Sequence, residues 1–223
     1  MRTKVVCMGD SITEGFGLES GESYPDRLQE LLGDAYEVVN KGVCCSTVLN
    51  VTLEGEVMGL PYARQERYAQ ALAEKGDIYV ILLGTNDAQD GMDDVEDFRN
   101  PLFYMISRKE EFCGCYQRIL DDVRRTSPDA RIYMGIPAPV MQCIWRKHQE
   151  KYLQELMPCF EALLAANPDV KKIDIHAAFL AQKPEILHSL YQADGLHPNA
   201  QGAFLIAQTV REALNTVDFT ALM

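Results

Sequence analysis

The feature that most constrains the fold is an almost continuously apolar run at residues 77–84, DIYVILLG. A strand with one face in water alternates apolar and polar residues, whereas this run has apolar side chains at every interior position. Such a run is typical of a parallel strand buried on both faces, and parallel strands need long crossover connections, usually helices. The run therefore predicts an α/β fold in which helices cover both faces of a sheet.

The rest of the chain alternates strand and helix patterns, as that fold requires. Strand patterns recur at residues 4–9, 35–40, 130–137 and 171–179, the last including the exit from the strand. Amphipathic helix patterns lie at residues 24–33 and 62–76, from about 107, at 147–166 and from 199. Pro158 is expected to bend or divide the fourth helix, and Asn199 to cap the fifth. Five strands with intervening helices predict one parallel sheet with right-handed crossovers.

Length and composition fit one globular domain over residues 1–223, because 223 residues with 47% hydrophobic content suffice for a real core. No apolar run approaches the roughly 20 residues of a membrane span. The opening residues, MRTKVVCMGDS, also lack the pattern of a secretory signal. We therefore expect a cytoplasmic protein without a membrane partner.

Charge and cysteine spacing exclude further classes of partner and cofactor. A net charge of −12 disfavours nucleic-acid partners. The 7 cysteines are odd in number and include no C-x-x-C pair, which indicates reduced thiols and not a disulfide framework or zinc ribbon. We expect a small-molecule substrate, no metal and no cofactor, and we leave a homo-oligomer open.

Polar and glycine residues gather where the predicted strands end. The first strand is followed by GDS at 9–11, the second by NKG at 40–42 and the third by GTND at 84–87. The last helix is preceded by DGLHPN at 194–199. Ligands of open parallel sheets bind beyond the carboxyl ends of the strands, so these four motifs are expected to share one site.

The residue types at this edge suit nucleophilic catalysis. A serine hydroxyl such as that of Ser11 becomes nucleophilic when a base takes its proton, and His197 has the right chemistry for that base. Asp194, three residues earlier, is placed to orient the imidazole. Backbone N–H groups of Ser11 and Gly42 and the side-chain amide of Asn86 are candidate donors for a tetrahedral oxyanion.

Together these motifs resemble the GDSL, or SGNH, hydrolase family: GDS with Ser11, a block with Gly42, GTND with Asn86 and D-x-x-H with Asp194 and His197. All four blocks occur in order across residues 9–197. The resemblance implies a flavodoxin-like three-layer α/β/α sandwich and metal-free hydrolysis of esters or thioesters. It also implies Ser11 as nucleophile, His197 as base and Asp194 as its orienting acid.

A finer resemblance, in stretches such as ILLGTNDA and DGLHPNAQGAFLIA, is to bacterial carbohydrate O-acetylesterases, which implies an acylated sugar as substrate. Two departures stand out. Many members have another glycine a few residues after the first in the second block, and GVCCST at 42–47 has none. Relatives of this type often carry a tryptophan soon after GTND, and this chain does not.

Several alternatives stay open at this point. Within enzymes, the runner-up is an acyl thioesterase or lysophospholipase. From another class comes a catalytically inactive carbohydrate-binding protein. Three other interpretations concern single residues. Ser11 could be a simple helix cap and Asp194 a turn residue. Asp174 and His176 form a rival acid–histidine pair.

Substrate contacts are expected from Asp10, Phe103 and Trp145, although Asp10 also suits a structural role with nearby loop amides. In the segment 87–106, the first eleven residues, 87–97, carry six acids and no basic residue. A solvated loop is the default interpretation; a lid and a calcium site are the others, and the spacing of a calcium-binding EF-hand is absent.

Overall fold

The computed structural model describes residues 2–50, 60–88, 109–141 and 149–215. The predicted strands form one five-stranded parallel sheet in the order β2-β1-β5-β6-β7. They are β1 (Thr3–Gly9), β2 (Tyr36–Gly42), β5 (Ile78–Leu82), β6 (Arg131–Ile136) and β7 (Lys171–Asp174). A second, two-stranded parallel sheet pairs β3 (Ser46–Thr47) with β4 (Leu60–Pro61) and was not anticipated.

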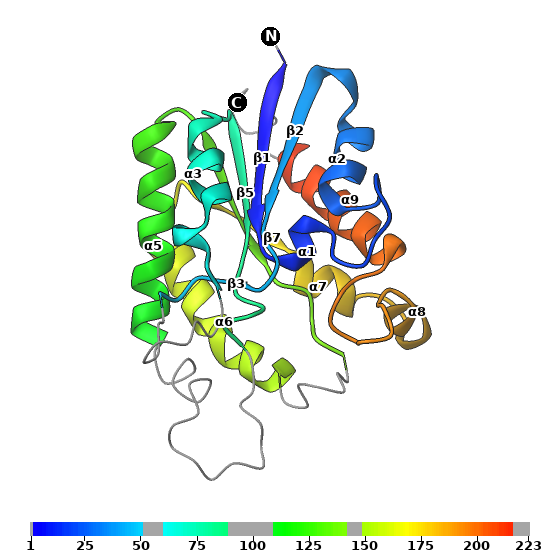
Figure 1. Cartoon of the computed structure of the whole chain (residues 1–223). Helices are drawn as coiled ribbons and strands as arrows, with labels where there is room; N and C mark the ends of the chain where they lie inside the picture. Colours follow the sequence, from blue (N-terminus) through cyan, green and yellow to red (C-terminus); the bar gives the residue numbers. More distant parts are fainter. Residues whose placement is uncertain (1, 51–59, 89–108, 142–148, 216–223) are drawn as a thin grey trace, which may run out of the picture.

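Helices cover both faces of the large sheet, which confirms the three-layer α/β/α sandwich (Figure 1). One layer holds α3 (Glu66–Ala73), α5 (Lys109–Thr126) and α6 (Gln149–Ala166). The other holds α2 (Tyr24–Leu32), α7 (Ile175–Leu180) and α9 (Ala200–Asn215). The shorter elements are α1 (Ser11–Glu14), α8 (Pro184–Ser189) and the 3₁₀ turns η1 (Gly33–Ala35) and η2 (Tyr62–Arg64). No helix in these described ranges is long and apolar enough to cross a membrane.

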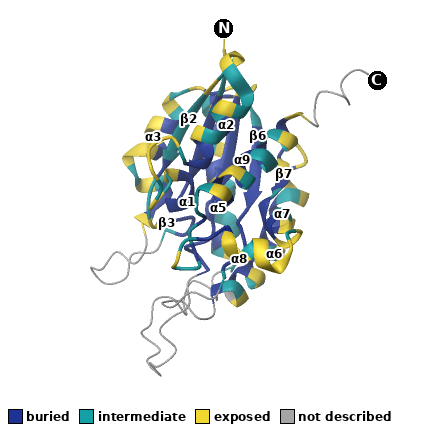
Figure 2. Ribbon diagram, turned by 90° about the vertical axis from the view of Figure 1, so that its right-hand side faces the viewer, coloured by how far each residue is buried: buried dark blue, intermediate teal, exposed yellow. Residues whose placement is uncertain are grey.

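The apolar core lies on the two faces of the sheet, and the central strands β1, β5 and β6 are its most buried part (Figure 2). All five residues of β5 are buried, as its apolar run predicts. On the side of α5 and α6, Phe112 and Phe160 meet edge to face with ring centroids 5.5 Å apart. On the opposite side, α9 buries the apolar residues expected from its helical spacing, namely Ala203, Ile206, Ala207, Val210 and Leu214.

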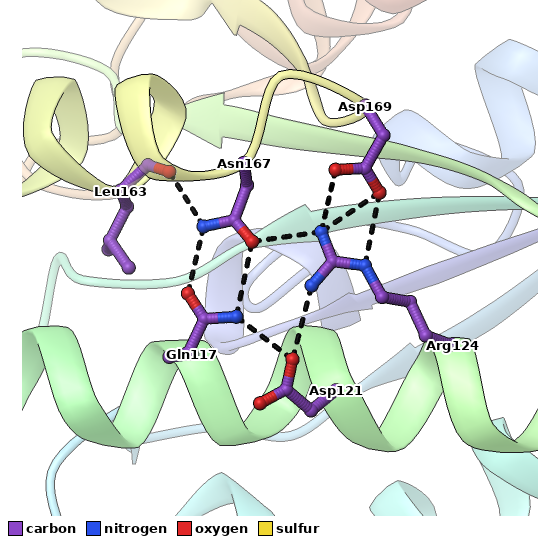
Figure 3. A network of polar contacts seen from close by, with 6 residues as sticks. All are labelled: Gln117, Asp121, Arg124, Leu163, Asn167 and Asp169. Atoms are coloured by element: carbon purple, nitrogen blue, oxygen red, sulfur yellow. Dashed lines mark hydrogen bonds and ion pairs between the residues drawn. The ribbon is translucent and has the colours of Figure 1, made fainter.

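A polar network joins α5 to the end of α6 (Figure 3). The buried Asn167 side chain donates to the carbonyl of Leu163 at 2.7 Å and to Gln117 Oε1 at 2.8 Å. Arg124 binds Asn167 Oδ1 at 2.9 Å and contacts both carboxylate oxygens of Asp169. Because the Asn167 amide is buried, these bonds satisfy groups that would otherwise be costly to remove from water.

Three features differ from the sequence expectation. The helix expected over residues 62–76 is divided into the 3₁₀ turn η2 and α3, which ends at Ala73. The fifth strand stops at Asp174, because the Asp174 carboxylate accepts a hydrogen bond from the N–H of Ala177 at 2.9 Å and caps α7. Residues 175–179, expected as the last part and exit of that strand, are therefore helical. Pro158 neither divides nor ends its helix, since α6 continues through it from Gln149 to Ala166.

Asn199 caps α9 as predicted. Its Oδ1 accepts hydrogen bonds from the N–H groups of Gln201 at 3.0 Å and Gly202 at 3.2 Å. Its Nδ2 also donates to the carbonyls of Ser189 at 2.7 Å and Tyr191 at 3.2 Å. One side chain thus starts the helix and anchors the loop that precedes it.

We expect Asn199→Ala to lower the free energy of unfolding by about 1–2 kcal/mol, because a lost cap leaves helix N–H groups without a partner. Urea unfolding followed by far-UV circular dichroism measures this change. Gln201→Ala, at an exposed position of the same helix, is the matched control. Equal effects of the two substitutions would contradict the assigned cap.

Candidate active site

Ser11 is the first residue of α1, the short helix that begins where β1 ends (Figure 1). Asp10 caps this helix, because its Oδ1 accepts a hydrogen bond from the N–H of Ile12 at 2.9 Å. The alternative that Ser11 itself serves as the cap is therefore wrong. Strand and cap together hold Ser11 at the carboxyl end of the sheet, where parallel α/β folds bind ligands.

The side chains of Ser11, His197 and Asp194 form a continuous chain of hydrogen bonds. Ser11 Oγ lies 2.9 Å from His197 Nε2, and His197 Nδ1 lies 2.6 Å from Asp194 Oδ2. The other oxygen, Asp194 Oδ1, accepts the N–H groups of Leu196 and His197, each at 2.9 Å. Asp194 is thus a turn residue and a partner of the imidazole at once. In this order of contacts, His197 can activate the Ser11 hydroxyl as a base while Asp194 orients the imidazole.

Opposing effects act on the Asp194 carboxyl. Burial alone would raise its pKa, but the His197 side chain and the N–H groups of His197 and Leu196 stabilise the carboxylate and lower the pKa below its ordinary value. The ionised acid can therefore stabilise an imidazolium when His197 takes up a proton.

Asn86 and Asp87, which follow β5, both hold the segment that follows β2. Asn86 Nδ2 donates to the carbonyl of Ser46 at 3.0 Å. The buried carboxylate of Asp87 accepts the N–H of Val48, at 3.0 Å from Oδ2, and the N–H of Leu49, at 2.9 Å from Oδ1. The GTND motif thus fixes the second loop of the site through both its amide and its carboxylate.

Gly42 has a packing role that its residue type explains. A Cβ at this position would lie 2.2 Å from the backbone nitrogen of Glu14, so only glycine lets β2 approach α1 this closely. The Gly42 N–H, expected to face an oxyanion, donates instead to Asn40 Oδ1 at 2.9 Å. That amide is therefore already engaged within its own loop.

Asp10 lies behind Ser11 and is fully buried. It therefore has the structural role suggested for it, supporting α1, and does not make the substrate contact that was also expected. Burial raises its pKa to about 7, opposed by the hydrogen bond from Ile12 and reinforced by the charge of Asp87. Burial likewise raises the pKa of Asp87 to about 6, opposed by the N–H groups of Leu49 and Val48. Two acids thus lie beneath the site in surroundings that disfavour their charges.

The remaining predicted residues are elsewhere. His176 Nδ1 contacts the carbonyl of Pro137 at 3.0 Å and its Nε2 contacts Gln154 at 2.9 Å, so this histidine joins β6 to α6. Phe103, Trp145 and the acidic segment after Ala88 lie outside the described residues.

Phe16 was not predicted from the sequence to lie at the site. Its ring packs against the His197 imidazole with centroids 4.7 Å apart, and the flanking glycines in GFG at 15–17 were the available signal.

A parallel three-layer sandwich with a Ser–His–Asp chain at its carboxyl edge is the architecture of a serine hydrolase, here without the G-x-S-x-G elbow. Residues 7–203 match the GDSL-like lipase/acylhydrolase family. The chain belongs to this family, as its motifs indicated.

Similar proteins agree with that assignment. An acetylxylan esterase of Xylanibacter ruminicola is 30% identical over 217 residues, which make up 95% of this chain but 43% of that protein. The chain thus spans less than half of this relative. Among solved structures, a carbohydrate acetylesterase family member from Sinorhizobium meliloti has a TM-score of 0.68 at 18% identity, covering 96% of this chain and 98% of that one. The acetyl xylan esterase AlAXEase has a TM-score of 0.68 at 20% identity, covering 95% and 99%. These two structures share the fold.

The buried Asp10 predicts a pH-dependent stability. Burial raises the pKa of its carboxyl from 3.8 to about 7 on folding, so the folded state binds more protons between these values. The free energy of unfolding should therefore fall as pH rises across this range, and the dependence should flatten in Asp10→Asn, whose Oδ1 can still cap α1.

Urea unfolding at several pH values between about 4 and 8 measures this slope for the wild type and the variant. Asp34→Asn, at an exposed acid, is the control and should keep the wild-type slope. An unchanged slope in Asp10→Asn would show that Asp10 does not titrate in this range.

Proposed function

We propose that this chain hydrolyses carboxylic esters through an acyl-enzyme on Ser11, and that its substrates are small acyl esters, chiefly acetyl esters, of carbohydrates. The hydrogen-bonded chain Ser11–His197–Asp194 is the observation that carries the proposal. The similarity to an acetylxylan esterase supports an acetyl group as the acyl part of the substrate and a sugar as its alcohol part. Because this chain corresponds to only 43% of that relative, the substrate is inferred for the domain and not transferred from the whole protein.

The proposed reaction has two halves. In the first, Ser11 Oγ attacks the acyl carbonyl carbon while its proton passes to His197 Nε2, and Asp194 stabilises the resulting imidazolium. Nε2 then gives this proton to the leaving alcohol oxygen as the ester C–O bond breaks. In the second half, water attacks the acyl carbonyl carbon while its proton passes to Nε2, and Nε2 returns that proton to Ser11 Oγ as the acyl C–Oγ bond breaks and the acid is released.

The oxyanion of each tetrahedral intermediate needs hydrogen-bond donors aimed at it. Ser11 is the first residue of a helix, so its N–H does not donate to a carbonyl within that helix. The side-chain amide of Asn86 is the second proposed donor. For the third, we assign Cys45 in place of Gly42.

The contacts of the loop after β2 support this assignment by elimination. The N–H groups of Gly42, Val43, Cys44 and Ser46 donate to Asn40 Oδ1, the Gly9 carbonyl, Glu14 Oε2 and the Val43 carbonyl. Among residues 42–46, this leaves the N–H of Cys45 without a hydrogen-bond acceptor in the described part of the chain. Cys45 also has a φ of 61°, a left-handed conformation that changes the direction of the chain at this residue. Cys45 directly precedes Ser46, whose carbonyl accepts a hydrogen bond from the Asn86 side chain.

We expect Cys45→Val to lower kcat at least tenfold, because a β-branched residue is strained at positive φ and displaces the N–H donor, and one such donor is typically worth about 100-fold or more. Cys45→Gly keeps the N–H in a relaxed left-handed backbone and should stay within about threefold of wild type. Steady-state hydrolysis of p-nitrophenyl acetate measures both.

Cys44→Val is the matched control, since Cys44 is the neighbouring cysteine and its φ is not positive. If Cys45→Val proves as active as Cys44→Val, the Cys45 N–H is not an oxyanion donor.

Ser11→Ala tests the central proposal. We expect this substitution to reduce hydrolysis of p-nitrophenyl acetate by more than about 1,000-fold, because the acyl-enzyme can no longer form. Far-UV circular dichroism should be unchanged, and Ser189→Ala, at an exposed serine of α8, should keep full activity. Undiminished hydrolysis by Ser11→Ala would overturn the proposal. A wild-type preference for acyl chains of eight or more carbons would favour a thioesterase or lysophospholipase instead.

A further inference from the structure

Phe16 is an aromatic side chain in an unusual place, at the edge of the candidate site and half exposed to solvent. Its exposed fraction is 50%, whereas Phe112, Phe160 and Phe179 are fully buried. Its ring lies against the imidazole of His197, with centroids 4.7 Å apart and planes inclined by 40°. Phe16 therefore leaves much of its apolar surface uncovered directly beside the proposed base.

The backbone around Phe16 is held firmly. The flanking Gly15 and Gly17 have φ values of 93° and 74°, which favour glycine and turn the chain back on itself. The Phe16 N–H donates to the carbonyl of Ser11 at 2.9 Å, and the Phe16 carbonyl accepts from Gln192 Nε2 at 2.7 Å. A Cβ at Gly17 would lie 2.3 Å from Gln192 Oε1. Phe16 is thus presented on a fixed turn and does not sit on a loosely tethered loop.

The position of Phe16 relative to the reaction identifies the part of the substrate it meets. His197 Nε2 must come within hydrogen-bond reach of the leaving alcohol oxygen to protonate it. The alcohol part of the ester therefore lies beside the imidazole, whereas the carbonyl oxygen points toward Asn86 and the oxyanion donors. Phe16, Leu18, His197 and Pro198 line a narrow hollow beside Ser11 that is too tight to hold a ligand, so a substrate would meet the exposed face of the Phe16 ring and not this hollow. Because the ring packs against His197, its exposed face lies next to the leaving alcohol.

We propose that Phe16 is a specificity-determining residue that recognises the alcohol part of the substrate, by packing the C–H face of a neutral sugar ring on its exposed aromatic face. An aromatic ring suits this ligand, since it offers a large, rigid apolar surface with only two side-chain torsions to fix. A small alcohol such as ethanol has too little surface to use it. The inference rests on the proposed esterase function and adds the residue that selects a sugar over a simple alcohol.

The test compares two acetyl esters that differ only in the alcohol, an O-acetylated methyl xyloside and ethyl acetate. We expect Phe16→Ala to lower the ratio of their kcat/KM values about tenfold, equivalent to ~1.4 kcal/mol of transition-state binding. Phe16→Tyr, which keeps the ring, should restore the ratio. Phe204→Ala is the matched control, since Phe204 is another phenylalanine exposed on the surface, by 38%, and does not border the hollow.

Other outcomes overturn the inference in distinguishable ways. Equal losses for both esters would mean that Phe16 acts by positioning His197. A shift in the ratio of p-nitrophenyl butyrate to p-nitrophenyl acetate hydrolysis, at constant alcohol, would place Phe16 on the acyl side. An unchanged ratio in an enzyme active on both esters would remove the inference but keep the esterase. If the wild type hydrolyses neither ester, the proposed function fails and the inference fails with it.

Discussion

The parallel pairing of β1 with both of its neighbours is the constraint on which the site depends. Gly9, the last residue of β1, lies in register with Gly42 of β2 and Leu82 of β5. The segments that follow these three strands therefore leave the sheet at one level, which brings Ser11 and Asn86 to the same edge. Parallel strands make this convergence a property of the topology, so distant motifs can act together without any local sequence connection.

Buried acids stabilise this edge without serving as the base. Asp10 fixes the turn of α1, and Asp87 holds the N–H groups of Val48 and Leu49. Their pKa values are raised because burial disfavours their charges, whereas Asp194 has enough hydrogen-bond donors to keep its pKa low. The acid that immediately precedes Ser11 is thus a structural group, and the acid that can stabilise an imidazolium comes from the far end of the chain.

The sequence was informative where chemistry follows from local spacing or periodicity. The apolar run at 77–84 predicted a fully buried strand, and the three-residue separation of Asp194 and His197 was enough to propose their contact. The direction of the Gly42 N–H could not be predicted, because it depends on the Asn40 side chain and the close approach of α1. Phe16 was missed for a similar reason. Whether a phenylalanine is core or exposed depends on the turn that presents it, and that turn is stabilised by Gln192 from another part of the chain.

Gln192 shows how the two ends of the chain are held together at the site. Its N–H donates to the carbonyl of His197 at 2.8 Å, while its Nε2 donates to the carbonyls of Phe16 at 2.7 Å and Pro198 at 3.1 Å. The turn after α1 and the loop carrying the histidine are therefore joined by a bridge separate from the Ser11–His197 contact itself. Since this bridge uses only backbone carbonyls on the partner segments, it fixes the imidazole beside both the serine and the aromatic ring before any substrate arrives. Such preorganisation is what an oriented base requires, because bonds already formed need not be arranged during the reaction.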